Sequence, residues 1–219
     1  MSQNSSDTNQ RDGNGSASLK TMSFKVCCVL GLPGAGKGTL CAMVKDQINF
    51  AHLSVGDHLR ELCKSDANTT PLDRFGMTQN ELKVLLDKRQ SVPPHQITPI
   101  IRDALTTIRD AGQYAGVLLD GYPREMAQIA DEEHDADFYP VCVMKLVCDP
   151  QTAKSRFLAR RRAADDTGQV WDYRAEKFSR NQPDVDDTYK MILHEVSTEI
   201  DVGQEEAVKA MLKVLVGVM

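Results

Sequence analysis

The stretch GLPGAGKGT, residues 31–39, follows directly on the apolar run of residues 24–30 and decides how the rest of this chain is interpreted. A strand that ends in closely spaced glycines and then opens a helix directs several backbone N–H groups at one point, where the helix dipole also favours negative charge. Lys37 can reach the outer phosphates of a nucleoside triphosphate from this position. The pattern therefore predicts a phosphate-binding loop, whose contacts we assign to Gly34, Ala35, Gly36, Lys37, Gly38 and Thr39.

The spelling of this loop departs from the strict P-loop pattern, which has Ser or Thr directly after the lysine. Here Gly38 follows the lysine, and the hydroxyl comes one residue later, at Thr39. This form is similar to the loops of the nucleoside monophosphate kinases, which include the adenylate kinases and their pyrimidine-specific relatives. A glycine-rich turn without a ligand is the alternative, and it is disfavoured because strand, loop, lysine and helix are all present.

The composition fits one α/β domain and argues against several classes of protein. The chain has 219 residues, of which 41% are hydrophobic, and this is enough to fill one large core. Its 26 basic and 31 acidic residues give a net charge of −5, so we expect no nucleic-acid polymer as a partner. The six cysteines contain no C-x-x-C pair and the five histidines lack metal-ligand spacing, so we expect a reducing compartment and no zinc.

The N-terminal residues 1–22 differ from the rest of the chain. They are rich in Ser, Asn, Gln, Asp and Gly, with almost nothing apolar to offset the entropy of ordering, so we expect a disordered tail before a domain at 23–219. The tail lacks the apolar region of a signal peptide, and its acidic residues argue against a transit peptide. No apolar run approaches the length of a membrane span. We therefore expect a soluble, cytoplasmic protein without membrane partners, and a monomer.

Short apolar or β-branched runs alternate with helix-patterned stretches along the domain. Because this alternation is typical of a parallel sheet covered by helices on both faces, we predict an α/β fold. A capping box at Thr78 and Glu81 starts one helix, and two prolines open another over residues 95–111, which ends at Gly112. The predicted strands are residues 24–30, 50–53, 116–119, 141–147 and 199–202.

Charged residues follow two of the predicted strands at their carboxyl ends, where ligands of open α/β sheets gather. Arg60 follows the second strand and Arg124 the third, which fits a second phosphorylated substrate beside the phosphate loop. Asp120 closes the buried third strand, where a lone carboxylate needs a counter-charge. Bound Mg²⁺, held directly or through water, is one candidate, and a salt bridge to Arg124 or Lys37 is the other.

A second group of arginines lies farther along the chain. Arg156 and Arg160 are four residues apart and share one face of a predicted helix. Arg161, Arg162 and Arg174 follow them. A charged helix end, whose cations complement the helix dipole, is one interpretation. Phosphoryl transfer is the other, because it spreads negative charge over oxygens that cations stabilise, and it needs no general base when the acceptor is an ionised phosphate.

From about Phe24 to the C-terminus, the order of these segments resembles the adenylate kinases, particularly the form with a short lid. The resemblance implies a P-loop protein with a central parallel sheet of five strands flanked by helices. It also implies a nucleoside-monophosphate-binding insert near residues 54–92 and a lid near residues 161–173. The implied reaction is transfer of the γ-phosphoryl group of Mg-ATP to AMP, which yields two ADP. ATP and AMP would then be the partners, and Mg²⁺ the cofactor.

The resemblance assigns roles residue by residue. Lys37 would contact the ATP phosphates, and Arg60 and Arg124 would hold the phosphate of AMP. Gln128 would recognise the adenine of AMP. The other implied assignments are the lid-side arginines Arg160, Arg162 and Arg174 around the transferred group, Val92 in the wall of the monophosphate pocket, and Gly203 in the loop beside the ATP base.

Two segments depart from the family's pattern. The lid usually carries Arg-x-Asp-Asp, whereas Ala163 stands two residues before Asp165 here, so Arg162 is taken as the displaced arginine. The insert between Arg60 and Arg89 is longer than in short adenylate kinases, so closure on the AMP side would differ.

The acceptor base is decided by two positions. Val55 stands where the family has an adenine-specific Thr, whereas Gln128 offers both a donor and an acceptor to adenine, so we expect AMP. A UMP/CMP kinase is the alternative within the same class. Two alternatives lie outside it: a P-loop NTPase that hydrolyses its nucleotide and signals through a partner, and a nucleotide-binding protein with weak or no transferase activity.

Overall fold

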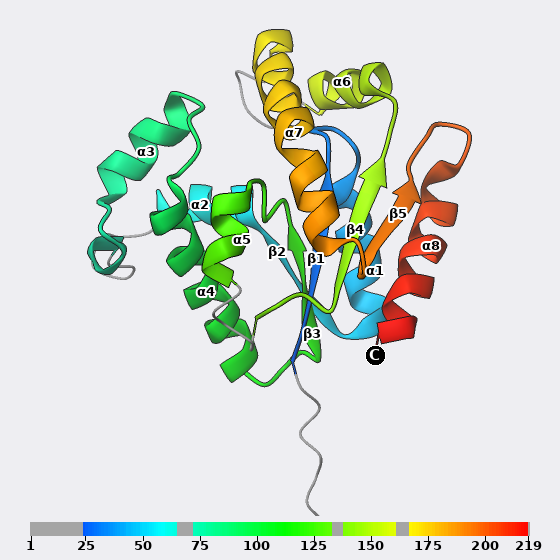
Figure 1. Ribbon diagram of the computed structural model, residues 1–219, viewed down its shortest axis with the longest axis horizontal. Coiled ribbons are helices and arrows are strands. Elements are labelled where there is room, and N and C mark those ends of the chain that lie inside the picture. Colours follow the sequence, from blue (N-terminus) through cyan, green and yellow to red (C-terminus); the bar gives the residue numbers. More distant parts are fainter. Residues whose placement is uncertain (1–23, 65–71, 133–137, 161–166, 219) are drawn as a thin grey trace, which may run out of the picture.

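The computed structural model describes residues 24–64, 72–132, 138–160 and 167–218. Within these residues, five strands form one sheet in the order β2-β3-β1-β4-β5, and every neighbouring pair is parallel (Figure 1). The predicted α/β fold is therefore confirmed, with the strand that leads into the glycine-rich loop at the centre of the sheet. The strands are β1 (Lys25–Gly31), β2 (Phe50–Ser54), β3 (Gly116–Asp120), β4 (Cys142–Val147) and β5 (Leu193–Ser197).

Helices cover both faces of this sheet. The α-helices of the described residues are α1 (Lys37–Ile48), α2 (Val55–Leu62), α3 (Gln79–Asp87), α4 (Pro94–Asp110), α5 (Met126–Glu132), α6 (Pro150–Ala159), α7 (Gly168–Tyr189) and α8 (Gly203–Val218). Side chains of a strand point alternately to the two faces, so β1 contributes to two cores. Val26 and Cys28 pack with apolar residues of α4 and α5, whereas Cys27 and Val29 pack with those of α1 and α8.

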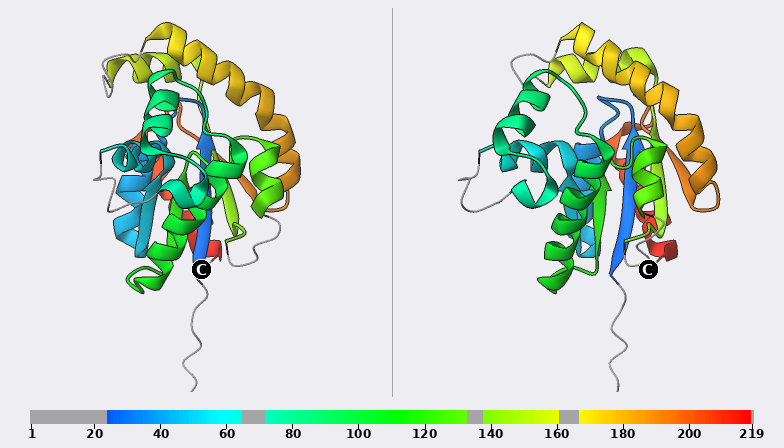
Figure 2. Two further views of the ribbon diagram at one scale, coloured as in Figure 1. Left: turned by 90° about the vertical axis from the view of Figure 1, so that its left-hand side faces the viewer. Right: turned by 60° about the vertical axis from the view of Figure 1, so that its left-hand side comes forward.

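Two groups of elements extend beyond the carboxyl edge of the sheet. On one side lie α2, the short 3-10 helix η1 (Leu72–Phe75) and α3, which together occupy the described part of the expected insert at 54–92 (Figure 1). On the other side lie α6 and the first turns of α7 (Figure 2). Of the expected lid, residues 167–173 form the cap and first turns of α7. Residues 161–166 of the lid and the expected tail at 1–22 lie outside the described residues.

Local sequence signals set the start of α3 and α4 as predicted. The Thr78 side chain accepts a hydrogen bond from the backbone N–H of Glu81, and the Glu81 carboxylate accepts one from the backbone N–H of Thr78. This reciprocal pair is a capping box, and it satisfies two N–H groups that the helix cannot pair internally. Pro94 is the first residue of α4, and Gly112 follows the helix with a positive φ of 64°.

The predicted fifth strand at residues 199–202 is wrong. This segment is a turn, in which Ile200 is 74% exposed, and the strand lies earlier, at Leu193–Ser197. β5 forms the edge of the sheet next to β4, and Val196 is its one fully buried residue. Its two apolar residues, Leu193 and Val196, are separated by His194 and Glu195, so its sequence lacks the apolar run that identified the other four strands.

The cysteines behave as small apolar residues, as expected from the sequence. All six are free thiols, and five of them are buried. Among the described residues, no helix combines the length and the apolar character that a membrane crossing requires.

Candidate functional site

The glycine-rich loop after β1 is held in one conformation by close backbone packing. Gly34 and Gly36 have positive φ values of 91° and 96°, which side chains rarely adopt. A Cβ atom on Gly34 would lie 1.9 Å from the carbonyl oxygen of Ala153 in α6, so any larger residue would force the loop and the helix apart. The loop therefore requires glycine here for two independent reasons, conformation and contact.

The side chain of Lys37, the first residue of α1, folds back over this loop. Its Nζ donates hydrogen bonds to the carbonyl oxygens of Gly31 at 2.7 Å and Leu32 at 3.0 Å. Burial lowers the pKa of Lys37 to about 8, with Arg124 and Arg160 adding to the effect and Asp120 opposing it. Desolvation is the largest cause, so the charged form of this buried ammonium group is not fully compensated by its neighbours.

The loop is also braced by the helix that follows the lid. The indole N–H of Trp171 in α7 donates a hydrogen bond of 2.8 Å to the carbonyl oxygen of Pro33. Lys154 of α6 lies over the same indole ring, 5.3 Å from its centroid, and forms an ion pair with Asp172. Residues 138 positions apart in the chain thus fix the position of the phosphate loop.

Asp120 lies beside the start of α1, at the end of β3. The residue is 8% exposed, and one of its carboxylate oxygens is 3.5 Å from Nε2 of His52 on the neighbouring strand β2. The same oxygen would lie 3.5 Å from a Cβ atom on Gly38. The structure thus places His52 next to the carboxylate, where the sequence suggested Mg²⁺ or a salt bridge to Arg124 or Lys37. No group of three or more metal-ligating His, Cys, Asp or Glu side chains occurs among the described residues.

Arg60 and Arg124 are both exposed, at the end of α2 and in the loop after β3. Arg60 pairs with Asp57 at 2.6 Å on its own helix, and Nε of Arg124 donates a hydrogen bond of 2.6 Å to the carbonyl oxygen of Gly121. Desolvation lowers the pKa of Arg124, Asp120 raises it, and Arg60 lowers it further. Arg60 thus acts on Arg124 as a like charge.

Gln128, the expected adenine-recognising residue, lies in α5 and is 4% exposed. Its Oε1 accepts a hydrogen bond of 2.7 Å from the backbone N–H of Arg124, and its Nε2 lies 3.5 Å from Oε1 of Glu125. The amide thus contacts the same loop that carries the phosphate-site arginine. Val55 and Val92 are buried in the apolar cluster on this side of the sheet.

The lid-side arginines Arg160 and Arg174 converge on one buried ring. The guanidinium carbon of Arg160 is 4.2 Å, and that of Arg174 is 6.0 Å, from the centroid of Phe157. Arg162 lies outside the described residues. Gly203 begins α8 with a φ of 73°, and Arg156 donates a hydrogen bond to the carbonyl oxygen of Thr198, which ties the turn before Gly203 to α6.

Comparison with known proteins agrees with this arrangement. The model of the adenylate kinase family matches residues 29–213. The chain belongs to the adenylate kinase family. It is 31% identical over 180 residues to adenylate kinase isoenzyme 5 of Homo sapiens, an alignment that covers 80% of this chain and 30% of that protein. It is 30% identical over 141 residues to isoenzyme 1 of Oryctolagus cuniculus (64% of this chain, 66% of that protein) and 31% identical over 192 residues to adenylate kinase of Streptococcus suis strain 05ZYH33 (82% of each).

The chain thus spans about a third of the isoenzyme 5 relative and just under two thirds of the isoenzyme 1 relative. The glycine-rich loop and the described arginines of both groups lie within the residues that the family model matches. Sequence reasoning did not find the contacts of His52 and Trp171. It also missed two residues of α7, Lys177 and Asn181, which donate hydrogen bonds to Ser91 and to the backbone carbonyl oxygen of Arg124. The unusual position of the only tryptophan, one helix turn into α7, was the signal that could have drawn attention to Trp171.

Proposed function

We propose that this protein catalyses reversible transfer of the γ-phosphoryl group from Mg-ATP to AMP, which gives two ADP. The observation that carries the proposal is electrostatic. Four cations from four different segments gather around the carboxyl edge of the sheet: Arg124 and Arg160 lower the pKa of Lys37, and Arg60 lowers the pKa of Arg124. Like charges are kept this close in a protein at a cost in stability, which a polyanionic ligand removes.

On the donor side, the loop and Lys37 bind the ATP phosphates. Nζ of Lys37 exchanges its two carbonyl partners, Gly31 and Leu32, for phosphate oxygens, and the N–H groups at the start of α1 face the same charge. Arg160 and Arg174 stabilise the negative charge that spreads over the transferred group. Arg162 is proposed for the same task on sequence grounds alone.

On the acceptor side, Arg60 and Arg124 hold the phosphate of AMP, and Gln128 recognises its base. The Oε1 atom of Gln128 has a second lone pair beside the one that faces Arg124, and its Nε2 can donate, so the amide can pair with adenine without leaving the loop. Buried Val55 and Val92 supply apolar contacts to the base. The phosphate of AMP is already ionised and attacks directly.

Mg²⁺ is proposed to arrive with ATP and to neutralise charge on its phosphates when bound. The residues fit such an ion. Asp120 presents a carboxylate beside the first turn of α1, and Thr39 offers an exposed hydroxyl in that turn. Oxygen donors of this kind suit Mg²⁺, which retains several of its own waters. We further propose, on sequence grounds, that the protein works as a monomer in the cytoplasm.

The proposal is tested by measuring ADP formation from Mg-ATP with AMP, CMP, UMP or no acceptor. We expect AMP to give the highest kcat/KM and the reaction without acceptor to be negligible, because closure over the phosphates excludes water. A higher kcat/KM for CMP or UMP would identify a pyrimidine nucleotide kinase, for which Val55 is the motivating residue. Release of phosphate without any acceptor would identify an NTPase.

A further inference from the structure

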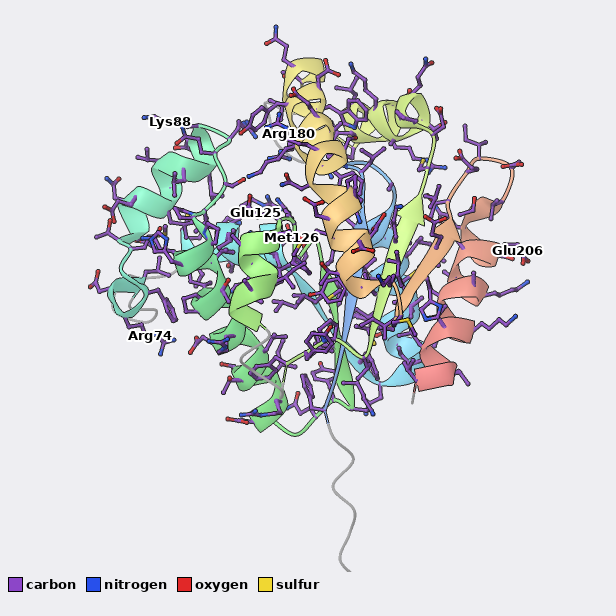
Figure 3. All side chains as sticks on the ribbon, viewed as in Figure 1. Arg74, Lys88, Glu125, Met126, Arg180 and Glu206 are labelled. Carbon is purple, nitrogen blue, oxygen red and sulfur yellow. The ribbon has the colours of Figure 1, made fainter. Side chains whose placement is uncertain are left out.

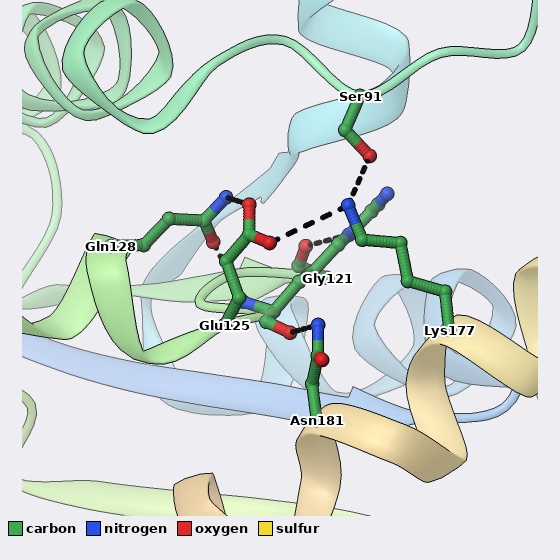
Figure 4. Close-up of polar contacts among 7 residues, drawn as sticks. Ser91, Gly121, Glu125, Gln128, Lys177 and Asn181 are labelled. Atoms are coloured by element: carbon green, nitrogen blue, oxygen red, sulfur yellow. Dashed lines mark hydrogen bonds and ion pairs between the residues drawn. The ribbon is translucent and has the colours of Figure 1, made fainter.

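The side chain of Lys177, in the middle of α7, joins three segments that are far apart in the chain. Its Nζ donates a hydrogen bond of 2.8 Å to Oγ of Ser91, in the segment that follows α3. It also lies 3.5 Å from Oε2 of Glu125 (Figure 4), a residue directly before α5 that is labelled in Figure 3. About 29% of the lysine side chain and 24% of the glutamate side chain are exposed, so water screens this ion pair only in part.

One helix turn farther along α7, Asn181 contacts the same loop. Residues four apart lie on one face of a helix, so Lys177 and Asn181 approach the loop together. The amide Nδ2 of Asn181 donates a hydrogen bond of 3.1 Å to the backbone carbonyl oxygen of Arg124. The backbone N–H of Arg124 is held from the other side by Gln128. Both peptide groups of the phosphate-site arginine are thus fixed by side chains of α5 and α7 (Figure 4).

The positive charge of Lys177 also matters for the acceptor phosphate. Glu125 is the residue next to Arg124, and its carboxylate is 3.5 Å from Nζ of Lys177. The lysine thus places a positive charge beside the one carboxylate that neighbours this arginine in sequence. The same lysine donates a hydrogen bond to Ser91, which directly precedes Val92. Val92 is the expected wall of the monophosphate pocket, so this bond holds the wall near the loop of Arg124.

We propose that Lys177, assisted by Asn181, is a positioning residue for the acceptor nucleotide: it sets the segment at Ser91 against the loop of Arg124 and Glu125. Lys177 itself does not touch the transferred group. Its contribution is to hold the pocket wall, the phosphate-site arginine and the base-recognising amide of Gln128 at fixed separations. The proposal rests on the proposed function in that it assigns the loop of Arg124 to the acceptor.

The matched control lies on the same helix. Arg180 pairs with Glu176 one turn before it, and both side chains are more than two thirds exposed. Arg180 and Lys177 therefore carry the same charge on the same helix and differ in what they touch.

The test is steady-state kinetics of Lys177→Met with AMP and Mg-ATP varied separately. We expect KM for AMP to rise about fivefold to tenfold, as the loss of one hydrogen bond and one partly buried ion pair implies, with KM for Mg-ATP within about twofold. Lys177→Arg should restore most of the affinity for AMP, because it retains the charge and several donors. Arg180→Met should leave both KM values within about twofold of the unsubstituted protein.

Ser91→Ala provides a second, independent variant at an exposed position. It should raise KM for AMP less than Lys177→Met does, and it should add little in the double variant, because both remove the same contact. The proposal is overturned if KM for AMP is unchanged in Lys177→Met, if KM for both nucleotides rises equally, or if Arg180→Met has the same effect. If the unsubstituted protein uses another monophosphate better than AMP, the same experiment is run with that acceptor, so a failure of the AMP assignment is distinguished from a failure of the positioning role.

Discussion

The phosphate loop and the insert at 54–92 face each other across the carboxyl edge of the sheet and are held in different ways. The loop is fixed by its backbone: Gly34 packs against the backbone of Ala153, and the carbonyl oxygen of Pro33 accepts from Trp171. The insert packs into the apolar core through Leu59, Leu72 and Leu82, and its end at Ser91 is joined to α7 by the hydrogen bond from Lys177. We refer to these as the donor side (residues 31–39 with α6 and the start of α7) and the acceptor side (the described residues of 54–92 with the loop of Arg124).

This difference in attachment indicates which side is rigid and which contacts can open. Where two backbone segments are in close contact, as at Gly34 and Ala153, only one arrangement is favourable. A shift of one segment by a few tenths of an ångström either loses van der Waals contacts or creates steric overlap. Exposed hydrogen bonds and ion pairs each contribute little and re-form with water when broken. The donor side should therefore be preformed, and the polar contact that joins Ser91 of the acceptor side to Lys177 should break and re-form at small cost. Four predictions test this contrast.

The largest effect is expected for Lys37→Met on the donor side. We expect kcat to fall by about a thousandfold or more with the fold retained, because a cation on the transferring phosphates is lost while a partly buried side chain of similar length remains. Lys45→Met, at the exposed end of the same helix, is the control and should be silent. The measurement is the rate of ADP formation together with circular dichroism. Near-native turnover in a folded Lys37→Met variant would remove the lysine from the mechanism.

A matched pair of glycine substitutions compares the two sides directly. Gly34 and Gly76 both have positive φ, 91° and 65°, so alanine is strained at each. A Cβ atom on Gly34 meets the backbone of Ala153, whereas a Cβ atom on Gly76, which follows η1, meets nothing within 4 Å. We expect Gly34→Ala to lower the free energy of unfolding by about 3 kcal/mol and Gly76→Ala by about 1 kcal/mol, measured by urea denaturation. Equal losses would contradict the contrast in packing.

The third prediction concerns pH. With a pKa of about 8, Lys37 loses its proton in the free protein between pH 7 and pH 9. The affinity for ATP should fall roughly tenfold over that range, whereas the affinity for AMP should stay constant, because Arg60 and Arg124 keep their charge. Isothermal titration calorimetry at several pH values gives both affinities.

The same group has a linked effect on stability. The folded-state pKa of Lys37 is lowered from 10.5, so between about pH 8 and 10.5 the unfolded state binds more protons than the folded state. The contribution of Lys37 to the free energy of unfolding therefore rises with pH in this window, and Lys37→Met should abolish the rise. A pH profile of unfolding that is the same with and without Lys37 would contradict the lowered pKa.

The smallest effect is expected for Arg89→Gly on the acceptor side. Arg89 follows the C-terminus of α3 with a φ of 62°, a conformation in which glycine is usual. We expect the glycine to raise the free energy of unfolding by about 0.5 to 1 kcal/mol, because the strain of the left-handed conformation is relieved. Arg89→Ala is the control, since it removes the side chain and keeps the strain. If alanine stabilises as much as glycine, the side chain and not the backbone is the cause.

The parts predicted correctly from the sequence are those that local patterns determine. The loop at 31–39, the central strands and the capping box at Thr78 each depend on residues within a few positions of one another. Strand β5 was misplaced because its apolar residues, Leu193 and Val196, are separated by His194 and Glu195 and form no apolar run.

Contacts between distant segments were beyond sequence reasoning. The bonds from Trp171 to Pro33 and from Lys177 to Ser91 join residues 138 and 86 positions apart. Whether such side chains meet depends on the angle at which α7 crosses the sheet. That angle is determined by how the whole core packs. For the same reason, the sequence did not reveal that Gln128 contacts the backbone of Arg124, or that His52 lies beside Asp120.

Trp171 is the only tryptophan of the chain, and its indole N–H is bonded to the phosphate loop itself. The emission of a buried indole depends on its hydrogen bond and on nearby charge, and both lie on the donor side, at Pro33 and Lys154. With ATP assigned to the loop and AMP to the acceptor side, as proposed, we expect intrinsic fluorescence to respond to ATP and to be largely insensitive to AMP. The filling of one nucleotide site could then be followed in real time while the other site is titrated.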